Sequence, residues 1–212
     1  MSAWNLEDGM HCVVLVRPVT ISSHSKTVSP AVRTKFKGNE KVARNIEIKA
    51  RVESMDAVAE KASAIATETP CTIFQDDTFF KCDNGRLKLR AFDNGTGQLI
   101  FYRRDDQDGP KESFYVLSET SSPDSLREAL SLAYGVIGRV RKKRLLYLVG
   151  RTRVHLDSVE GLGDFMELEV VLRDGESTNA GVQEADGLMQ RLGIQPGQLV
   201  KGAYFDLLRT GQ

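Results

Sequence analysis

The feature that most constrains this chain is a set of short segments in which charged and apolar residues alternate. In residues 45–52, Glu47 and Lys49 fall on one face, whereas Ile46 and Ile48 fall on the other. A period of two is that of a β-strand, in which successive side chains point to opposite faces of a sheet. The segment therefore predicts a strand with one buried apolar face and one charged face.

The same pattern returns along the chain with a recurring set of side chains. Residues 86–92 place Lys88 and Arg90 on one face, opposite leucines. Residues 151–169 read as a hairpin around a glycine-containing turn, because the alternation is interrupted there and then resumes. Its charged faces carry cations, a histidine and carboxylates: Arg153, His155, Asp157, Glu167 and Glu169.

Helices are expected between these strands, because capping residues precede stretches with helical apolar spacing. The predicted helices span about 54–68, 122–135 and 177–192, the last ended by Gly193. The remaining predicted strands lie near 76–82, 99–105 and 112–119. Residues 136–149 are predicted to form two strands with a turn at 141–143, and residues 201–208 a short tail.

The charged faces leave two interpretations of the sheet. An antiparallel sheet can keep its charged side in water and its apolar side under helices. However, like charges at a spacing of two repel one another, and a surface has little reason to keep them. If the sheet closes on itself, these faces line a tunnel. The residues thus predict an α+β fold with about eight strands in a large antiparallel sheet and flanking helices, and they leave its closure open.

Composition narrows the class of protein. The 212 residues contain 29 Lys plus Arg and 29 Asp plus Glu, so no general affinity for nucleic acid is expected. No apolar run is long enough to span a membrane. Three cysteines without CxxC spacing favour a reducing compartment, and we expect a cytoplasmic protein. Residues 1–44 are predicted to be a flexible N-terminal extension, with a targeting peptide as the alternative. No nucleotide-binding GxGxxG or P-loop motif is present.

The order of these motifs resembles the CYTH domain, the triphosphate tunnel fold shared by class IV adenylyl cyclases and thiamine triphosphatases. Asn45-Ile-Glu-Ile-Lys49 is similar to the ExExK signature of that family, with Asn45 in place of the first Glu. Residues 204–208 resemble the family's ending, so the resemblance covers about three quarters of the chain and implies a CYTH domain over residues 45–209. It also implies the fold: α+β, a closed antiparallel eight-stranded β tunnel with a charged interior and flanking helices. The other matching positions are Lys88, Arg90, Lys142, Arg144, Asp157, Glu167 and Glu169, and Arg103 stands where the family usually has a Lys.

The resemblance implies a site for a small-molecule triphosphate. It assigns catalytic roles to Lys49 and Asp157, and a divalent cation, Mg²⁺ or Mn²⁺, to Glu47, Glu167 and Glu169. Asp157 is either a metal ligand or a group that orients a cation. The predicted phosphate-binding residues are Lys49, Lys88, Arg90, Arg103, Lys142, Arg144 and Arg153. Arginine is suited to bidentate contact with phosphate oxygens.

Three functions remain open at this point. A class IV adenylyl cyclase would convert ATP to cyclic AMP and pyrophosphate, and this is the expected activity. A triphosphate hydrolase would act on thiamine triphosphate or tripolyphosphate with the same residues. A non-catalytic phosphate-binding protein is the third, because Asn45 offers a carbonyl oxygen but no charge, which weakens a metal site. The sequence predicts no oligomeric state.

Overall fold

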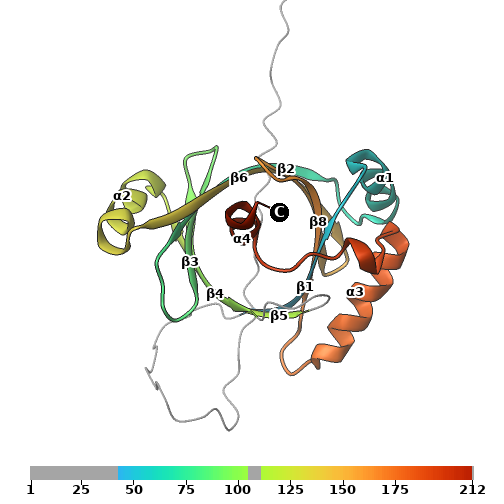
Figure 1. Cartoon of the computed structure of the whole chain (residues 1–212). Coiled ribbons are helices and arrows are strands. Elements are labelled where there is room, and N and C mark those ends of the chain that lie inside the picture. Colours follow the sequence, from blue (N-terminus) through green and yellow to red (C-terminus); the bar gives the residue numbers. More distant parts are fainter. Residues whose placement is uncertain (1–42, 105–110, 212) are drawn as a thin grey trace, which may run out of the picture.

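Eight antiparallel strands form a closed ring in the computed structural model, which describes residues 43–104 and 111–211. Hydrogen-bonded neighbours follow the order β1-β5-β4-β3-β2-β6-β7-β8, and β8 pairs back onto β1 (Figure 1). The predicted closed tunnel is therefore confirmed. The strands are β1 (Ala43–Arg51), β2 (Cys71–Phe80), β3 (Arg86–Phe92), β4 (Gly97–Arg104), β5 (Lys111–Thr120), β6 (Val136–Val149), β7 (Thr152–Val159) and β8 (Gly163–Val171).

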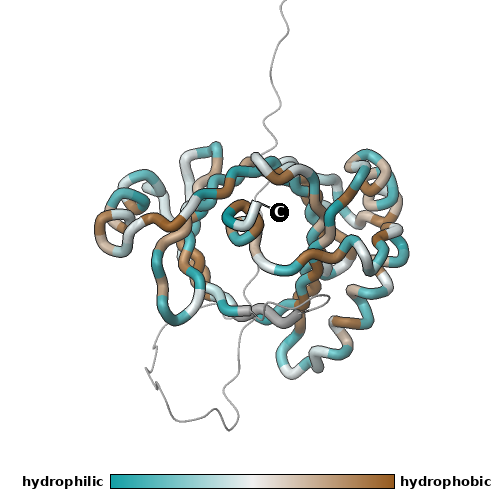
Figure 2. Tube along the Cα trace, in the orientation of Figure 1, coloured by the Kyte–Doolittle hydropathy of each residue, from teal (hydrophilic) through white to brown (hydrophobic). Residues whose placement is uncertain are grey.

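Alternation along the strands decides what faces the inside of the ring. Figure 2 shows hydrophilic and hydrophobic residues following one another around the barrel wall. On β1, Ile46 and Ile48 pack outward in a buried apolar cluster, whereas Glu47 and Lys49 line the interior. This is the reverse of an ordinary small barrel, whose interior is filled with apolar side chains.

The outward apolar faces are covered by helices at one side of the ring. There α1 (Met55–Ile65) and α3 (Thr178–Leu192) pack against residues of β1, β7 and β8. Ser54 caps α1 by accepting a hydrogen bond from the Ala57 amide, and Gly193 ends α3 in the left-handed conformation. At the opposite side of the ring lies α2 (Pro123–Tyr134) (Figure 1).

Residues 136–149 differ from expectation. They form one continuous strand of 14 residues, β6, and not two strands joined by a turn. The basic run that suggested a turn is divided between the two faces of the strand. Lys142 and Arg144 are buried and line the tunnel, whereas Arg141 and Lys143 are exposed on the outside.

The C-terminal segment also differs from the predicted tail. Residues Tyr204–Thr210 form a short helix, α4, which lies within the ring of strands (Figure 1). Tyr204 and Phe205 belong to a buried apolar cluster with inward-facing residues of the barrel, including Phe79 and Phe165. The rings of Phe79 and Phe205 stack with their centroids 5.0 Å apart. The helix therefore closes one end of the tunnel.

The predicted N-terminal extension, residues 1–44, lies outside the described residues except for its last two. In the part of the chain that the structure describes, none of the helices is long and apolar enough to cross a membrane.

Candidate functional site: a cation-lined tunnel

A cavity of about 230 Å³ lies inside the ring. All the strands contribute inward-facing side chains to it, because each strand alternates and the ring is closed. Its charged or titratable lining residues are Glu47, Lys49, Asp77, Lys88, Arg90, Lys142, Arg144, Arg153, His155, Glu167 and Glu169.

One wall is organised around Asp77 on β2. Its carboxylate accepts hydrogen bonds from Arg90 Nε at 2.7 Å, Arg90 Nη2 at 2.8 Å and Lys88 Nζ at 2.7 Å. Although burial alone would raise the pKa of Asp77, Arg90 and Lys88 hold it well below its usual range. Burial and the neighbouring Arg90 lower the pKa of Lys88 to about 7, against the opposing effect of Asp77. Asp77 therefore fixes both cations of β3 in the tunnel.

A second wall repeats this arrangement with Asp157 on β7. This carboxylate is fully buried and accepts hydrogen bonds from Lys142 at 2.9 Å, from Arg144 through two nitrogens at 2.6 Å, and from the Tyr204 hydroxyl at 3.0 Å. Burial opposes ionisation, but Arg144 and Lys142 keep the pKa of Asp157 low. Asp157 lies behind the cavity wall and is not among the residues that line the cavity. Because its oxygens are bound in this way, it is placed to orient Lys142 and Arg144 on β6.

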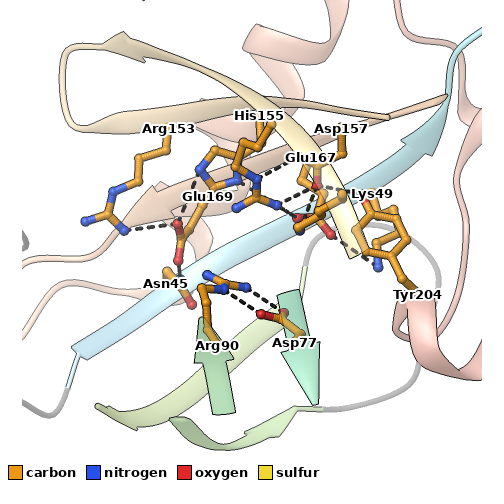
Figure 3. Close-up of polar contacts among 12 residues, drawn as sticks. Asn45, Lys49, Asp77, Arg90, Arg153, His155, Asp157, Glu167, Glu169 and Tyr204 are labelled. Atoms are coloured by element: carbon orange, nitrogen blue, oxygen red, sulfur yellow. Dashed lines mark hydrogen bonds and ion pairs between the residues drawn. The ribbon is translucent and has the colours of Figure 1, made fainter. Parts of the chain in front are cut away.

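The third wall, made by β1, β7 and β8, carries carboxylates paired with cations (Figure 3). Glu167 lies 3.2 Å from Lys49 Nζ and 2.6 Å from Arg144 Nη2. Glu169 lies 3.0 Å from Arg153 Nη1. Burial would raise the pKa of both glutamates, but these cations lower it, so both carry negative charge.

His155 lies between these two glutamates. Its Nδ1 is 3.9 Å from Glu167 and its Nε2 is 3.9 Å from Glu169. Burial and the nearby Arg144 lower the pKa of His155, which favours the neutral imidazole. The side chain is buried.

Asn45 is the unusual member of this wall. It is fully buried, and its amide nitrogen donates a hydrogen bond to Glu169 Oε1. That contact fixes the amide, because the opposite orientation would place two oxygens against each other. The Asn45 Oδ1 atom is then buried without a hydrogen-bond partner among the described residues. A buried acceptor left in this state is uncommon and calls for a ligand or a water.

The residues of this wall fit a divalent cation by their chemistry. Glu47 and Glu169 are direct partners in the β1–β8 register, and Glu167 follows two positions away. Carboxylate oxygens with the unpartnered Asn45 carbonyl are the ligands that Mg²⁺ and Mn²⁺ prefer. However, no three acidic, histidine or cysteine side chains converge into a ready metal site in the described ranges. Glu167 and Glu169 are held by cations, so they must turn away from them to share a metal.

The structure brings most of the predicted site residues together, but it places Arg103 elsewhere. Tyr102 takes the inward position on β4 and lines the cavity, so Arg103 points to the other face of the strand. Arg103 is exposed, and its guanidinium lies 5.6 Å from the Phe101 ring centroid.

Two further residues of the site were missed by sequence reasoning, Asp77 and Tyr204. A two-residue turn at Asn84–Gly85 would place Asp77 opposite Phe92, whereas the structure pairs Asp77 with Arg90, so the turn signal alone does not reveal this contact. The Tyr204 ring lies 4.0 Å from Lys49 Nζ and 4.8 Å from Lys142 Nζ, where it contacts both cations through its face.

The charges do not balance within the cavity. Among the described residues its lining contains six basic side chains but only four carboxylates, and Asp157 behind them adds a fifth. Buried cations in excess of their counterions attract anions, and several guanidinium and ammonium groups around one cavity suit a polyanion. The fold and the site together define a β-tunnel domain with a polycationic interior.

Comparison with known proteins agrees with this class. The sequence matches the CYTH domain family over residues 43–204, and the chain belongs to this family. The adenylate cyclase CyaB of Aeromonas hydrophila is 26% identical over 170 residues, which cover 75% of this chain and 85% of that protein.

Solved structures share the fold. A protein of Pyrococcus horikoshii OT3 matches with a TM-score of 0.70 and 24% identity, over 77% of this chain and 99% of that one. A Hippeastrum protein, a candidate adenylyl cyclase described with a dominant triphosphatase activity, matches with a TM-score of 0.59 and 19% identity. That match covers 79% of this chain and 96% of the Hippeastrum chain.

Proposed function

We propose that the tunnel binds the triphosphate of a nucleotide together with Mg²⁺ or Mn²⁺, and that the protein converts ATP to cyclic AMP and pyrophosphate. The observation that carries this proposal is the excess of inward-facing basic side chains over carboxylates on the cavity wall. An extended chain of phosphates can contact cations from all sides of a tunnel, whereas a single phosphate cannot. The A. hydrophila cyclase among the relatives supports the same reaction.

The direction of the substrate follows from α4. Since α4 closes one end of the ring, the terminal phosphate would point toward Lys49 and Tyr204, and the organic group toward the open end. Arg90, Arg144 and Arg153 would hold the oxygens between these ends. Lys49 would contact the phosphate chain directly, and Asp157 would keep Lys142 and Arg144 in position.

The substrate would displace carboxylates from their present partners. Phosphate oxygens compete with Glu167 for Lys49 and Arg144, and with Glu169 for Arg153, because each contact is a charge-assisted hydrogen bond. Released glutamates could then hold the metal with Glu47. A divalent ion bound there offsets phosphate charge and makes the phosphorus more susceptible to attack.

The position of the carboxylates favours attack at the phosphate nearest the organic group. On β1 and β8, Glu47 and Glu169 lie farther from α4 than Lys49 and Glu167 do. The α-phosphate lies at that end in the proposed direction of binding, as cyclisation requires: the ribose 3′ oxygen attacks the α-phosphorus and pyrophosphate leaves.

Hydrolysis of a triphosphate is the second candidate. It is supported by the triphosphatase activity described for the Hippeastrum protein, which shares the fold. In this reaction water attacks the terminal phosphorus, close to Lys49 and Tyr204. The same cations would hold the substrate in both reactions, so the nucleophile and the metal position distinguish them.

Product analysis tests these proposals. Purified protein is incubated with Mg²⁺ or Mn²⁺ and with ATP, thiamine triphosphate or tripolyphosphate. Cyclic AMP with pyrophosphate supports the cyclase, and free phosphate supports the hydrolase. Tight binding without turnover would refute both enzymatic proposals, and failure to bind any of the three would refute the triphosphate site itself.

A further inference from the structure

The open end of the tunnel, opposite α4, has a lining different from its cationic middle. Ile73, Phe92 and Leu146 face the cavity there from three neighbouring strands, β2, β3 and β6. Gln75 lies among them, paired in register with Phe92 on one side and with Lys142 on the other. An apolar surface with one amide thus adjoins the cations that would hold phosphates.

The amide of Gln75 is buried without a matching partner. The residue is 6% exposed, and its Oε1 atom has no hydrogen-bond partner in the described part of the chain. Such an acceptor destabilises the folded protein unless a ligand or water supplies a donor. Gln75 lines the tunnel, so a ligand that enters it could supply the missing donor if the side-chain amide turns to bring Oε1 to the tunnel surface.

The surrounding charges fix which end of the amide faces the ligand. Lys142 is the register neighbour of Gln75 on β6, and Arg90 precedes Phe92 by two residues on β3. Side-chain amide dipoles orient in the field of nearby charges, and a positive field favours the carbonyl oxygen pointing into the tunnel. Gln75 is therefore set to accept a hydrogen bond.

The size of the cavity places the organic group at this end. The volume of about 230 Å³ is below the roughly 300–1,000 Å³ of sites that enclose a drug-sized ligand. A phosphate chain can fill the cationic middle, which leaves the ring of an organic triphosphate at the mouth. There Phe92, Ile73 and Leu146 offer contact for a flat ring, and Gln75 offers an acceptor at its edge.

We propose that Gln75 determines specificity for a triphosphate whose organic group is an aminated heterocyclic ring, through a hydrogen bond from the ring amino group to Oε1. The inference rests on the proposed function, because it requires a triphosphate in the tunnel. Glutamine pairs with adenine in this way, accepting from the amino group and donating to the adjacent ring nitrogen. Adenine, cytosine and the aminopyrimidine of thiamine share that chemistry. Hypoxanthine and uracil place a carbonyl oxygen at the same position.

The experiment compares ligands that differ at this one group. Dissociation constants, and kcat/KM where turnover occurs, are measured with Mg²⁺ for ATP against ITP, for CTP against UTP, and for thiamine triphosphate. Tripolyphosphate, which has no ring, reports on the phosphate site alone. At least one aminated nucleotide should bind about tenfold more tightly than its carbonyl counterpart, the discrimination of one good amide–base pair. The tightest of the three aminated ligands identifies the ring.

Two variants complete the test. Gln75→Leu should reduce the ratio of affinities for the aminated and carbonyl nucleotides to about one, and it should unfold at a temperature no lower than the wild type, because it removes an unpartnered buried acceptor. Gln190→Leu, the same substitution at an exposed position on α3, should keep the wild-type ratio.

The outcomes separate the two proposals. If tripolyphosphate binds but the wild type does not distinguish ATP from ITP or CTP from UTP, the role of Gln75 is refuted and the triphosphate site stands. Lower thermal stability of Gln75→Leu with an unchanged ratio would also refute it, since the amide would then be structural. If neither tripolyphosphate nor any of the organic triphosphates binds, both proposals are refuted.

Discussion

Replacing Asp77 with Asn tests whether the cations of the tunnel depend on their buried carboxylates. The Asp77 side chain is 4% exposed, and its carboxylate is the ion-pair partner of Lys88 and Arg90, which are 15% and 13% exposed. Asn keeps the shape but leaves two neighbouring cations without this counterion. Removing one partner of a buried ion pair costs about 3–5 kcal/mol.

The expected cost lies at the lower end of that range. The pKa of Lys88 is already lowered to about 7, and the loss of Asp77 lowers it further, so Lys88 can relieve the repulsion by losing its proton. A cost of about 3 kcal/mol corresponds to a fall in the unfolding temperature of roughly 10 °C for a chain of this size. Calorimetry without ligand measures it. Tripolyphosphate should then stabilise Asp77→Asn more than the wild type, because it restores negative charge at the same cations.

Asp76→Asn is the matched control for this experiment. Asp76 pairs with Arg139, whose side chain is 48% exposed, so its loss should cost at most about 1 kcal/mol. Equal unfolding temperatures of the two variants would refute the reasoning. So would a ligand-induced shift in Asp77→Asn that is smaller than in the wild type.

Three further predictions concern charge in the tunnel. The affinity for tripolyphosphate without metal should weaken as pH rises above about 7, because Lys88 binds phosphate only when protonated. The ratio of the wild-type affinity to that of Lys88→Arg, which stays charged, should change by up to about tenfold per pH unit. A constant ratio would show that Lys88 does not bind the phosphate chain. Mn²⁺ alone should bind the protein weakly, since Glu167 and Glu169 are engaged by cations, and tripolyphosphate should strengthen Mn²⁺ binding. Paramagnetic resonance measures free Mn²⁺, with protein-free mixtures as the reference for chelation by tripolyphosphate. Equal Mn²⁺ affinities with and without tripolyphosphate would contradict this prediction. With tripolyphosphate present, Asn45→Glu should tighten Mn²⁺ binding by roughly tenfold, because it adds a charged ligand. Without metal it should lower the unfolding temperature, because the new carboxylate repels Glu169. Asn45→Gln is the control and should not tighten Mn²⁺ binding.

The alternation of charged and apolar residues predicted strands with one charged and one apolar face, and the family resemblance indicated that these strands close into a tunnel. Such a strand must bury its apolar face and must provide counterions for the clustered like charges on its other face. A closed ring meets both requirements, because the apolar face packs outward under helices and the charged face meets opposite charges inside. The same pattern placed Glu47, Lys49, Lys88, Arg90 and the later glutamates on the inner face, where the structure has them. These positions depend on a period of two alone, which is local in the sequence.

What the sequence did not reveal depends on contacts between distant segments. Asp77 follows Gln75 and Asp76, so its strand shows no contrast between a charged and an apolar face. The four consecutive basic residues 141–144 suggested a turn, although on a 14-residue strand they simply divide between two faces. The seven-residue helix α4 is too short to be stable alone and forms where the barrel encloses it.

The paired charges explain how a polycationic tunnel can fold without its ligand. Six cations in one cavity would repel one another strongly, yet Asp77, Asp157, Glu167 and Glu169 each contact at least one of them. These carboxylates divide into two kinds. The Asp77 and Asp157 side chains are only 4% and 0% exposed, against about a fifth for the two glutamates, and they serve as permanent counterions. Glu167 and Glu169 face Glu47 across β1 and β8, so they can exchange cations for a metal when phosphate takes their place. Substitution of the fourth acidic position by Asn45 leaves the tunnel one charge more positive, which favours the phosphate chain over the metal in that exchange.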